Sequence, residues 1–146
     1  MKSQVVKGAR ISGCLYNLIR KNKFISPESK TRIYKSWNRP VITYGAEARA
    51  DTVHTQQLLR TTEMRIVRTI HGETLRDRIY SKELRKLSEI KDIVEWVNYR
   101  RRYRAEHVER MSDDRLPKIV LNYRPGGYRS RGRPKKRWKE SYDPEG

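Results

Sequence analysis

The chain has 146 residues, with 35 Lys and Arg against 17 Asp and Glu, a formal net charge of +18 and a pI of about 10.4. A field of this size attracts polyanions; nucleic acid is the commonest, and an anionic membrane is the main alternative. No apolar run reaches the ~18 residues of a membrane span, and the N-terminus lacks the apolar run of a signal peptide. The single cysteine, Cys14, allows no intrachain disulfide. We expect DNA or RNA as partner, no membrane, and a nuclear or cytoplasmic location.

The hydrophobic core is expected to be thin. Leu, Ile, Val and Phe make up about 21% of the chain, close to the ~20% below which a highly charged chain stays disordered. The composition therefore predicts helices that pack loosely.

The first half of the chain predicts three helices. Residues 5–20 form a rough apolar stripe that glycines weaken. Ser26-Pro27-Glu28 is a good helix start, and that helix is expected to kink at Pro40 and to end at Gly45. A third helix should begin after Asp51-Thr52 and end at Gly72.

The second half predicts a short helix from Ser81, which can cap it, through Leu87. The longest helix should cover residues 91–111, and a brief one residues 117–121. No pair of strands is recognisable, so the predicted class is all-α. From 122 to 139 the chain has eight basic residues, no acid, three glycines and two prolines, which predicts a disordered basic tail.

The tail contains Arg131-Gly132-Arg133-Pro134, which matches the core of an AT-hook. Glycine lets the backbone approach a groove floor, and proline keeps the chain extended so that arginines can enter an A·T minor groove. Lys135, Lys136 and Arg137 would hold phosphates, as would Arg129. General phosphate binding and a nuclear localisation role remain the alternatives.

A second basic cluster lies within the longest predicted helix: Arg100, Arg101, Arg102 and Arg104. Arginine forks bind phosphate bidentately, so we expect phosphate contact; a solvated face with an Arg102–Glu106 pair is the alternative. Trp37 and Trp96 are expected to pack in the core, and Trp138 to be free to stack on a base.

Nothing in the chain predicts catalysis, a metal site or a cofactor. Met111-Ser112-Asp113-Asp114 mimics the paired carboxylates of a polymerase palm, but the pair ends a helix, so its aspartates are expected to form a turn or cap. The three histidines have no zinc-ligand spacing. Cys14 is expected to be a small core residue, and Glu63 to pair with an arginine.

Six blocks in order resemble the region after the palm of non-LTR (LINE-type) retrotransposon reverse transcriptases. The blocks are Ile33–Ser36 leading to Arg39–Glu47, Thr61–Arg65, Thr74–Arg78, Asp92–Trp96, His107–Met111 and Gly132–Trp138. The sequence departs from the family pattern at Trp37-Asn38, where smaller or apolar residues are expected, and at Ala48, where many relatives have Trp.

The resemblance implies a helical thumb over 1–72, a helical C-terminal segment over 73–121 and a basic tail over 122–146. In the family these parts grip template and primer, while the palm and any endonuclease domain would lie before Met1. The chain is then a nucleic-acid-binding fragment that is not an enzyme by itself, with the upstream part of the polymerase as a second partner. The alternatives are a free-standing AT-hook-like DNA-binding or chromatin protein and a small basic RNA-binding protein.

Overall fold

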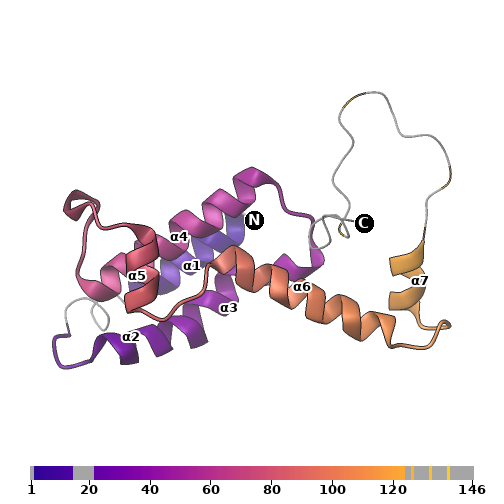
Figure 1. Ribbon diagram of the computed structural model, residues 1–146, viewed down its shortest axis with the longest axis horizontal. Helices are drawn as coiled ribbons and strands as arrows, with labels where there is room; N and C mark the ends of the chain where they lie inside the picture. The colour runs from indigo at the N-terminus through magenta and orange to yellow at the C-terminus, as the bar shows by residue number, and fades with distance from the viewer. Residues whose placement is uncertain (1, 15–21, 124–125, 127–131, 133–137, 139–146) are drawn as a thin grey trace.

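The computed structural model describes residues 2–14 and 22–123, together with the single residues 126, 132 and 138. Within these residues the chain is all-α and has no strand, which confirms the predicted class. The helices shown in Figure 1 are α1 (Lys2–Cys14), α2 (Pro27–Ile33), α3 (Arg39–Ile42), α4 (Val53–His71), α5 (Ser81–Leu87), α6 (Ile93–Glu109) and α7 (Leu116–Asn122).

Most helix ends follow the capping residues that the sequence predicted. The Ser26 hydroxyl accepts from the Ser29 amide, and Thr52 forms a reciprocal capping box with Thr55. Gly45 and Gly72 adopt φ values of 65° and 75°, the left-handed region that ends a helix without a Cβ clash. Ser81 was expected to be a cap, but it is the first residue of α5 and Tyr80 precedes it without a side-chain cap.

A π-helical turn, Tyr34–Asn38, takes the place of the kink predicted at Pro40. The Arg39 amide donates to the Tyr34 carbonyl five residues earlier, which widens the turn just before the proline. Pro40 then stands in the first turn of α3, the part of a helix that tolerates proline best. Trp37 lies on the outer side of this turn and is 63% exposed, so the prediction that it packs in the core is wrong.

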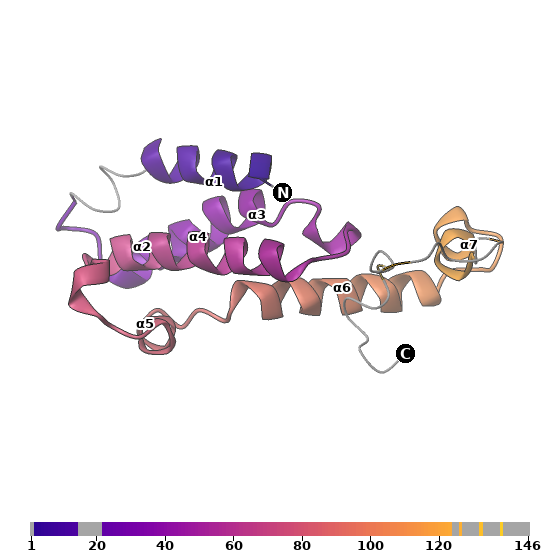
Figure 2. The same ribbon diagram turned by 90° about the horizontal axis from the view of Figure 1, so that it is seen from above.

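One core joins the two halves of the chain. Its apolar side chains come from the segment 34–42 and from α4, α5 and the start of α6: Tyr34, Ile42, Leu59, Met64, Ile66, Val67, Ile70, Leu84, Ile90, Ile93 and Val94. In Figure 2, α4 lies between α1 on one side and α6 on the other. The division predicted at residue 72, between a thumb-like part and a C-terminal segment, stays an expectation. Core residues lie on both sides of it.

The helix α1 packs closely on α3 at a glycine. A Cβ added to Gly8 would come within 2.4 Å of Cγ1 of the buried Ile42, so only glycine fits there without a shift. Cys14 is exposed, and the prediction that it is a core residue is wrong. Six residues of helix rotate its side chain by about 240° from the contact made at Gly8.

Candidate nucleic-acid interface

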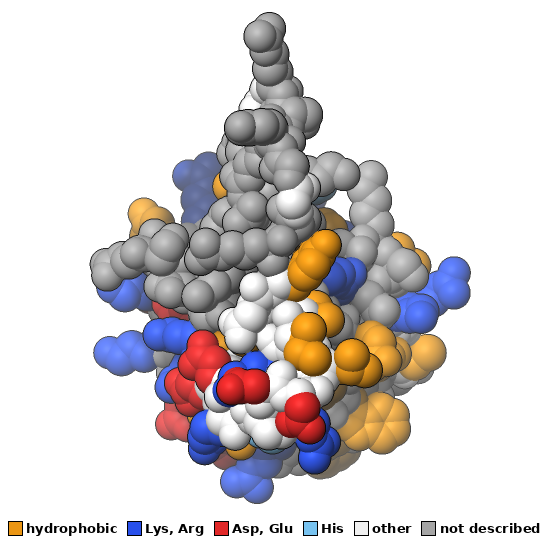
Figure 3. Space-filling view, turned by 90° about the vertical axis from the view of Figure 1, so that its right-hand side faces the viewer, with side chains coloured by type: hydrophobic (Ala, Val, Ile, Leu, Met, Phe, Trp, Pro, Cys, Tyr) orange, Lys and Arg blue, Asp and Glu red, His pale blue; other side chains and the backbone are white. Residues whose placement is uncertain are grey.

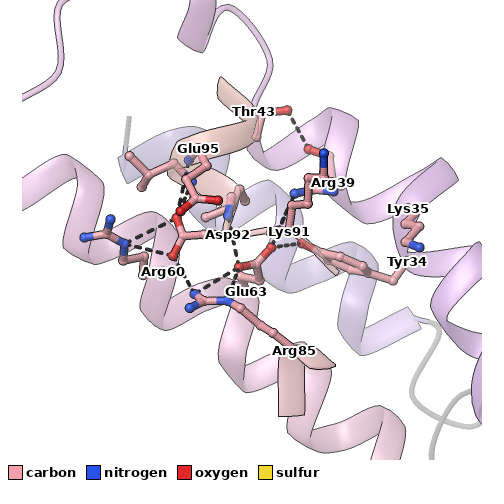
Figure 4. Close-up of polar contacts among 12 residues, drawn as sticks. Tyr34, Lys35, Arg39, Thr43, Arg60, Glu63, Arg85, Lys91, Asp92 and Glu95 are labelled. Atoms are coloured by element: carbon pink, nitrogen blue, oxygen red, sulfur yellow. Dashed lines mark hydrogen bonds and ion pairs between the residues drawn. The ribbon is translucent and has the colours of Figure 1, made fainter. Parts of the chain in front are cut away.

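The exposed surface of α6 is held in place by a buried ionic network around Glu63, which Figure 4 shows. The Glu63 carboxylate, fully buried on α4, accepts hydrogen bonds from the Tyr34 hydroxyl at 3.0 Å and the Ile93 amide at 3.2 Å. Arg85 and Arg39 place guanidinium nitrogens 3.3 and 3.8 Å from its oxygens. The expected pairing of Glu63 with arginine is confirmed, and it joins α4 to α3, α5 and α6.

A second carboxylate extends this network to the N-terminus of α6. Asp92 lies 2.9 Å from Arg85 and 3.1 Å from Arg60, and its Oδ1 also accepts from the Val94 amide at 2.8 Å. The side chain therefore caps α6 while it pairs with arginines from α4 and α5. The start of α6 is fixed on α4 by charge as well as by apolar packing.

Burial and the neighbouring arginines have opposite effects on the pKa of Glu63. Burial raises the pKa of the Glu63 carboxyl above its ordinary value, and the neighbouring Arg39 and Arg85 work against that increase. Burial, and then the charge of Glu63, raise the pKa of the Tyr34 hydroxyl. Tyr34 therefore stays a hydrogen-bond donor to the carboxylate.

Arg101 corrects the sequence prediction, which placed it among the phosphate-binding arginines. Its side chain is fully buried, with Nη2 2.7 Å from Asp51 and 2.8 and 2.9 Å from the carbonyl oxygens of Ala46 and Arg49. These three contacts all involve Nη2 of a guanidinium group that solvent does not reach. Arg101 thus fastens α6 to the 3-10 turn Ala46–Ala48 and is not available to a phosphate.

The outer face of α6 combines exposed arginines with exposed tyrosines. Arg100, Arg102 and Arg104 are exposed, and Tyr99 and Tyr103 are each 61% exposed. Guanidinium groups bind phosphates and aromatic rings stack on bases, which are the two contacts that a single-stranded or frayed nucleic acid offers. The three exposed arginines stay predicted contact residues.

The two flanks of this face differ in charge. Helical spacing places Arg100, Arg104 and His107 along one flank. Arg102 lies on the other flank, whose neighbours at helical spacing include Glu95 and Glu106. No ion pair between Arg102 and Glu106 occurs in the described structure. The flank with Arg100 and Arg104 is the more strongly basic.

Trp96 lies beside the basic flank. It is half-buried outside the core cluster, contrary to the core position expected for it. The guanidinium carbons of Arg39 and Arg100 lie 4.9 and 5.3 Å from its ring centroid, within the ~6 Å of a cation–π contact. The ring thereby links the arginine of the Glu63 network to the first arginine of the exposed face.

One exposed face of α7 is apolar rather than basic. Four side chains at helical spacing form one face of α7 and are 48–75% exposed: Leu116, Ile119, Val120 and Tyr123. Figure 3 looks onto the α7 end of the molecule, where hydrophobic side chains gather on one side and acidic ones on the other. The exposed basic face belongs to α6 and not to the helix that follows it.

The two aspartates that mimic a palm motif lie in the turn between α6 and α7, as predicted. Asp113 pairs with Lys118 at 2.7 Å, and the hydrogen bond and charge of Lys118 lower the pKa of its carboxyl. Among the described residues, no group of three or more His, Cys, Asp or Glu side chains could hold a metal ion. No helix in the described part of the chain is long and apolar enough to cross a membrane.

Most of the predicted tail site lies outside the described residues: Arg129, Arg131, Arg133, Pro134, Lys135, Lys136 and Arg137. Gly132 is described and has a φ of 110°, a conformation that favours glycine. Trp138 is half-buried, and its indole N–H donates to the Glu47 carbonyl, so it has a partner on the helical part of the chain.

Comparison with known proteins found a relative by sequence. No protein-family model and no solved structure matches the chain. Over 117 residues it is 29% identical to a Caenorhabditis elegans protein named as a transposon-derived protein, F52C9.6. The match covers 77% of this chain and 42% of that protein, so the chain spans less than half the length of its relative. The chain is thus similar to a protein of transposon origin.

Proposed function

We propose that the chain is a nucleic-acid-binding segment of a non-LTR retrotransposon reverse transcriptase, from the region that follows the catalytic palm. It grips template–primer or target DNA without reading sequence, and it does not polymerise nucleotides by itself. The upstream part of the polymerase is its second partner. The location of the chain is the nucleus or the cytoplasm, where its nucleic acid lies.

The exposed face of α6 is the observation that carries this proposal. A helix fixed at its start by Glu63 and Asp92, and near its middle by Arg101, presents Arg100, Arg104 and two tyrosines to solvent. Rigid placement lowers the entropy lost when these side chains bind a phosphate backbone. The charge of +18, the transposon-derived relative and the six family blocks give further support.

Salt-dependent binding tests the proposal. Affinity for short labelled DNA, RNA and hybrid duplexes is measured by fluorescence anisotropy from about 50 to 200 mM salt. Each phosphate neutralised contributes about 0.9 to the slope of log affinity against log salt on B-form DNA. The double variant R100Q/R104Q should therefore flatten that slope by about 1.8 units.

The matched control is K82Q/K86Q, which removes the same charge from two exposed residues of α5. It should leave the slope nearly unchanged, because long-range attraction alone is screened over about 10 Å at these salt concentrations. Equal flattening by both variants would show that only net charge matters. A wild-type chain that binds none of the duplexes would overturn the proposal.

A further inference from the structure

A groove beside α4 and α5 contains arginines suited to a second phosphate site. Its volume is about 880 Å³, and it lies between α4, α5, Ala9 of α1 and the turn at 74–75. Figure 2 shows α1 and α6 on opposite sides of α4. Arg60 and Arg85 line the groove and also pair with Asp92 at the start of α6, whereas Arg100 and Arg104 of α6 are not part of its lining.

The lining combines apolar side chains with basic and hydroxyl-bearing ones; the apolar residues are Ala9, Leu58, Met64, Ile66 and Leu75. It contains four arginines, five Ser and Thr residues and one acid, Glu73. Along α4, Thr61, Arg65, Arg68 and Thr69 recur at intervals of three and four residues, which places them on one side of the helix.

Two of the four arginines are already paired, and two are not. Arg60 and Arg85 contact the carboxylates of the Glu63 network. Arg65 is exposed and Arg68 is half-buried, and neither has an ion pair or side-chain hydrogen bond to any described residue. Because their charge is not neutralised by the protein, Arg65 and Arg68 are the groups that a bound anion would neutralise.

We infer that this groove binds the phosphate backbone of a nucleic acid strand through Arg65 and Arg68; the inference rests on the proposed function and adds a site to it. From Thr61 to Thr69 the helix rises about 12 Å, at 1.5 Å per residue. One strand of a B-form duplex places a phosphate about every 3.4 Å along its axis, so roughly three phosphates face this length. Guanidinium forks and the Thr61 hydroxyl supply donors and read no base.

The test measures the salt slope of the full chain on a short labelled DNA duplex. The double variant R65Q/R68Q should lower the slope by about 1.8 units, at about 0.9 per phosphate contact. The control K82Q/K86Q, which changes the charge equally outside the groove, should keep the wild-type slope. Because Arg68 is half-buried, the single variant R65Q is measured as well, with an expected loss of about 0.9 units.

The outcomes separate this inference from the proposed function. A wild-type chain that does not bind duplex overturns both. A chain whose slope falls with R100Q/R104Q but is unchanged with R65Q and with R65Q/R68Q keeps the proposed function and loses the groove. Additive flattening by the α6 and groove variants would show that both sites contact phosphate.

Discussion

Replacing Glu63 by alanine is the sharpest test of the buried network. The variant removes the only carboxylate that contacts both Arg39 and Arg85 among the described residues. Arg39 has 7% of its side chain exposed, so water cannot fully solvate the charge left behind on it, whereas Arg85 keeps its pair with Asp92. The substitution also removes the acceptor for the Tyr34 hydroxyl and the Ile93 amide.

The expected loss follows from these contacts. Removing one member of a buried ion pair costs about 3–5 kcal/mol, because the remaining charge is uncompensated. A chain of this length has a free energy of unfolding of roughly 7–22 kcal/mol at about 0.05–0.15 kcal/mol per residue. Glu63→Ala should therefore remove a large share of the stability and loosen the attachment of α6 to α4.

Urea unfolding followed by circular dichroism measures this loss, with Glu83→Ala as the control. Glu83 is exposed on α5, so its replacement should change the free energy of unfolding by less than about 0.5 kcal/mol. If Glu63→Ala cost no more than Glu83→Ala, with the same dependence on urea, the network would not hold the fold together and the argument would fail.

Three further changes have expected outcomes. Arg101→Met should cost about 3–5 kcal/mol in urea unfolding, and replacing its carboxylate partner by leucine as well should recover most of that loss. Burial lowers the pKa of His71 below 6.5. The stability that its neutral form contributes is therefore complete above about pH 6.5 and is lost as the pH falls through the folded pKa. Thermal melts of His71→Gln should lack this decline. Gly8→Ala should destabilise by about 1–3 kcal/mol because its Cβ would meet a buried side chain, whereas Gly13→Ala, with open space around it, should stabilise by about 0.5–1 kcal/mol in the same assay.

The helices and their ends could be predicted because their causes are local. Ser26, Thr52 and the two glycines Gly45 and Gly72 act on the turn in which they lie, and apolar spacing places α4 and α6. The exposed positions of Trp37 and Cys14 could not be predicted in this way. They depend on how the π turn and α1 pack against the rest of the chain.

The buried role of Arg101 was missed because arginines that follow one another in sequence look equivalent when helix geometry is not considered. At 100° per residue, Arg101 points to the side of α6 that Val97, Ala105 and Val108 share. The apolar spacing of that side was a signal that could have separated it from its neighbours. Its partner Asp51 lies fifty residues earlier, and only the fold brings the two together.

Asn38 is one of the positions at which the sequence departs from the pattern of the family that it resembles, and the structure shows a physical consequence. Its side chain is completely buried, and neither its amide nitrogen nor its amide oxygen has a hydrogen-bond partner in the described structure. An amide buried in this way costs about 1–3 kcal/mol relative to a satisfied one. The smaller or apolar residue expected at this position would avoid that cost.

The π turn makes this segment tolerant of exchange and of the loss of one residue. Lys35, Ser36 and Trp37 are exposed, so other side chains fit at these positions. A π turn fits about one residue more into a helical turn than an α-helix does, so loss of one exposed residue from it would restore α-helical winding and keep Tyr34 and Arg39 on nearly the same face. Both side chains would then still reach Glu63. Among relatives that keep the ionic network, natural variation here should include the loss of one residue as well as substitutions.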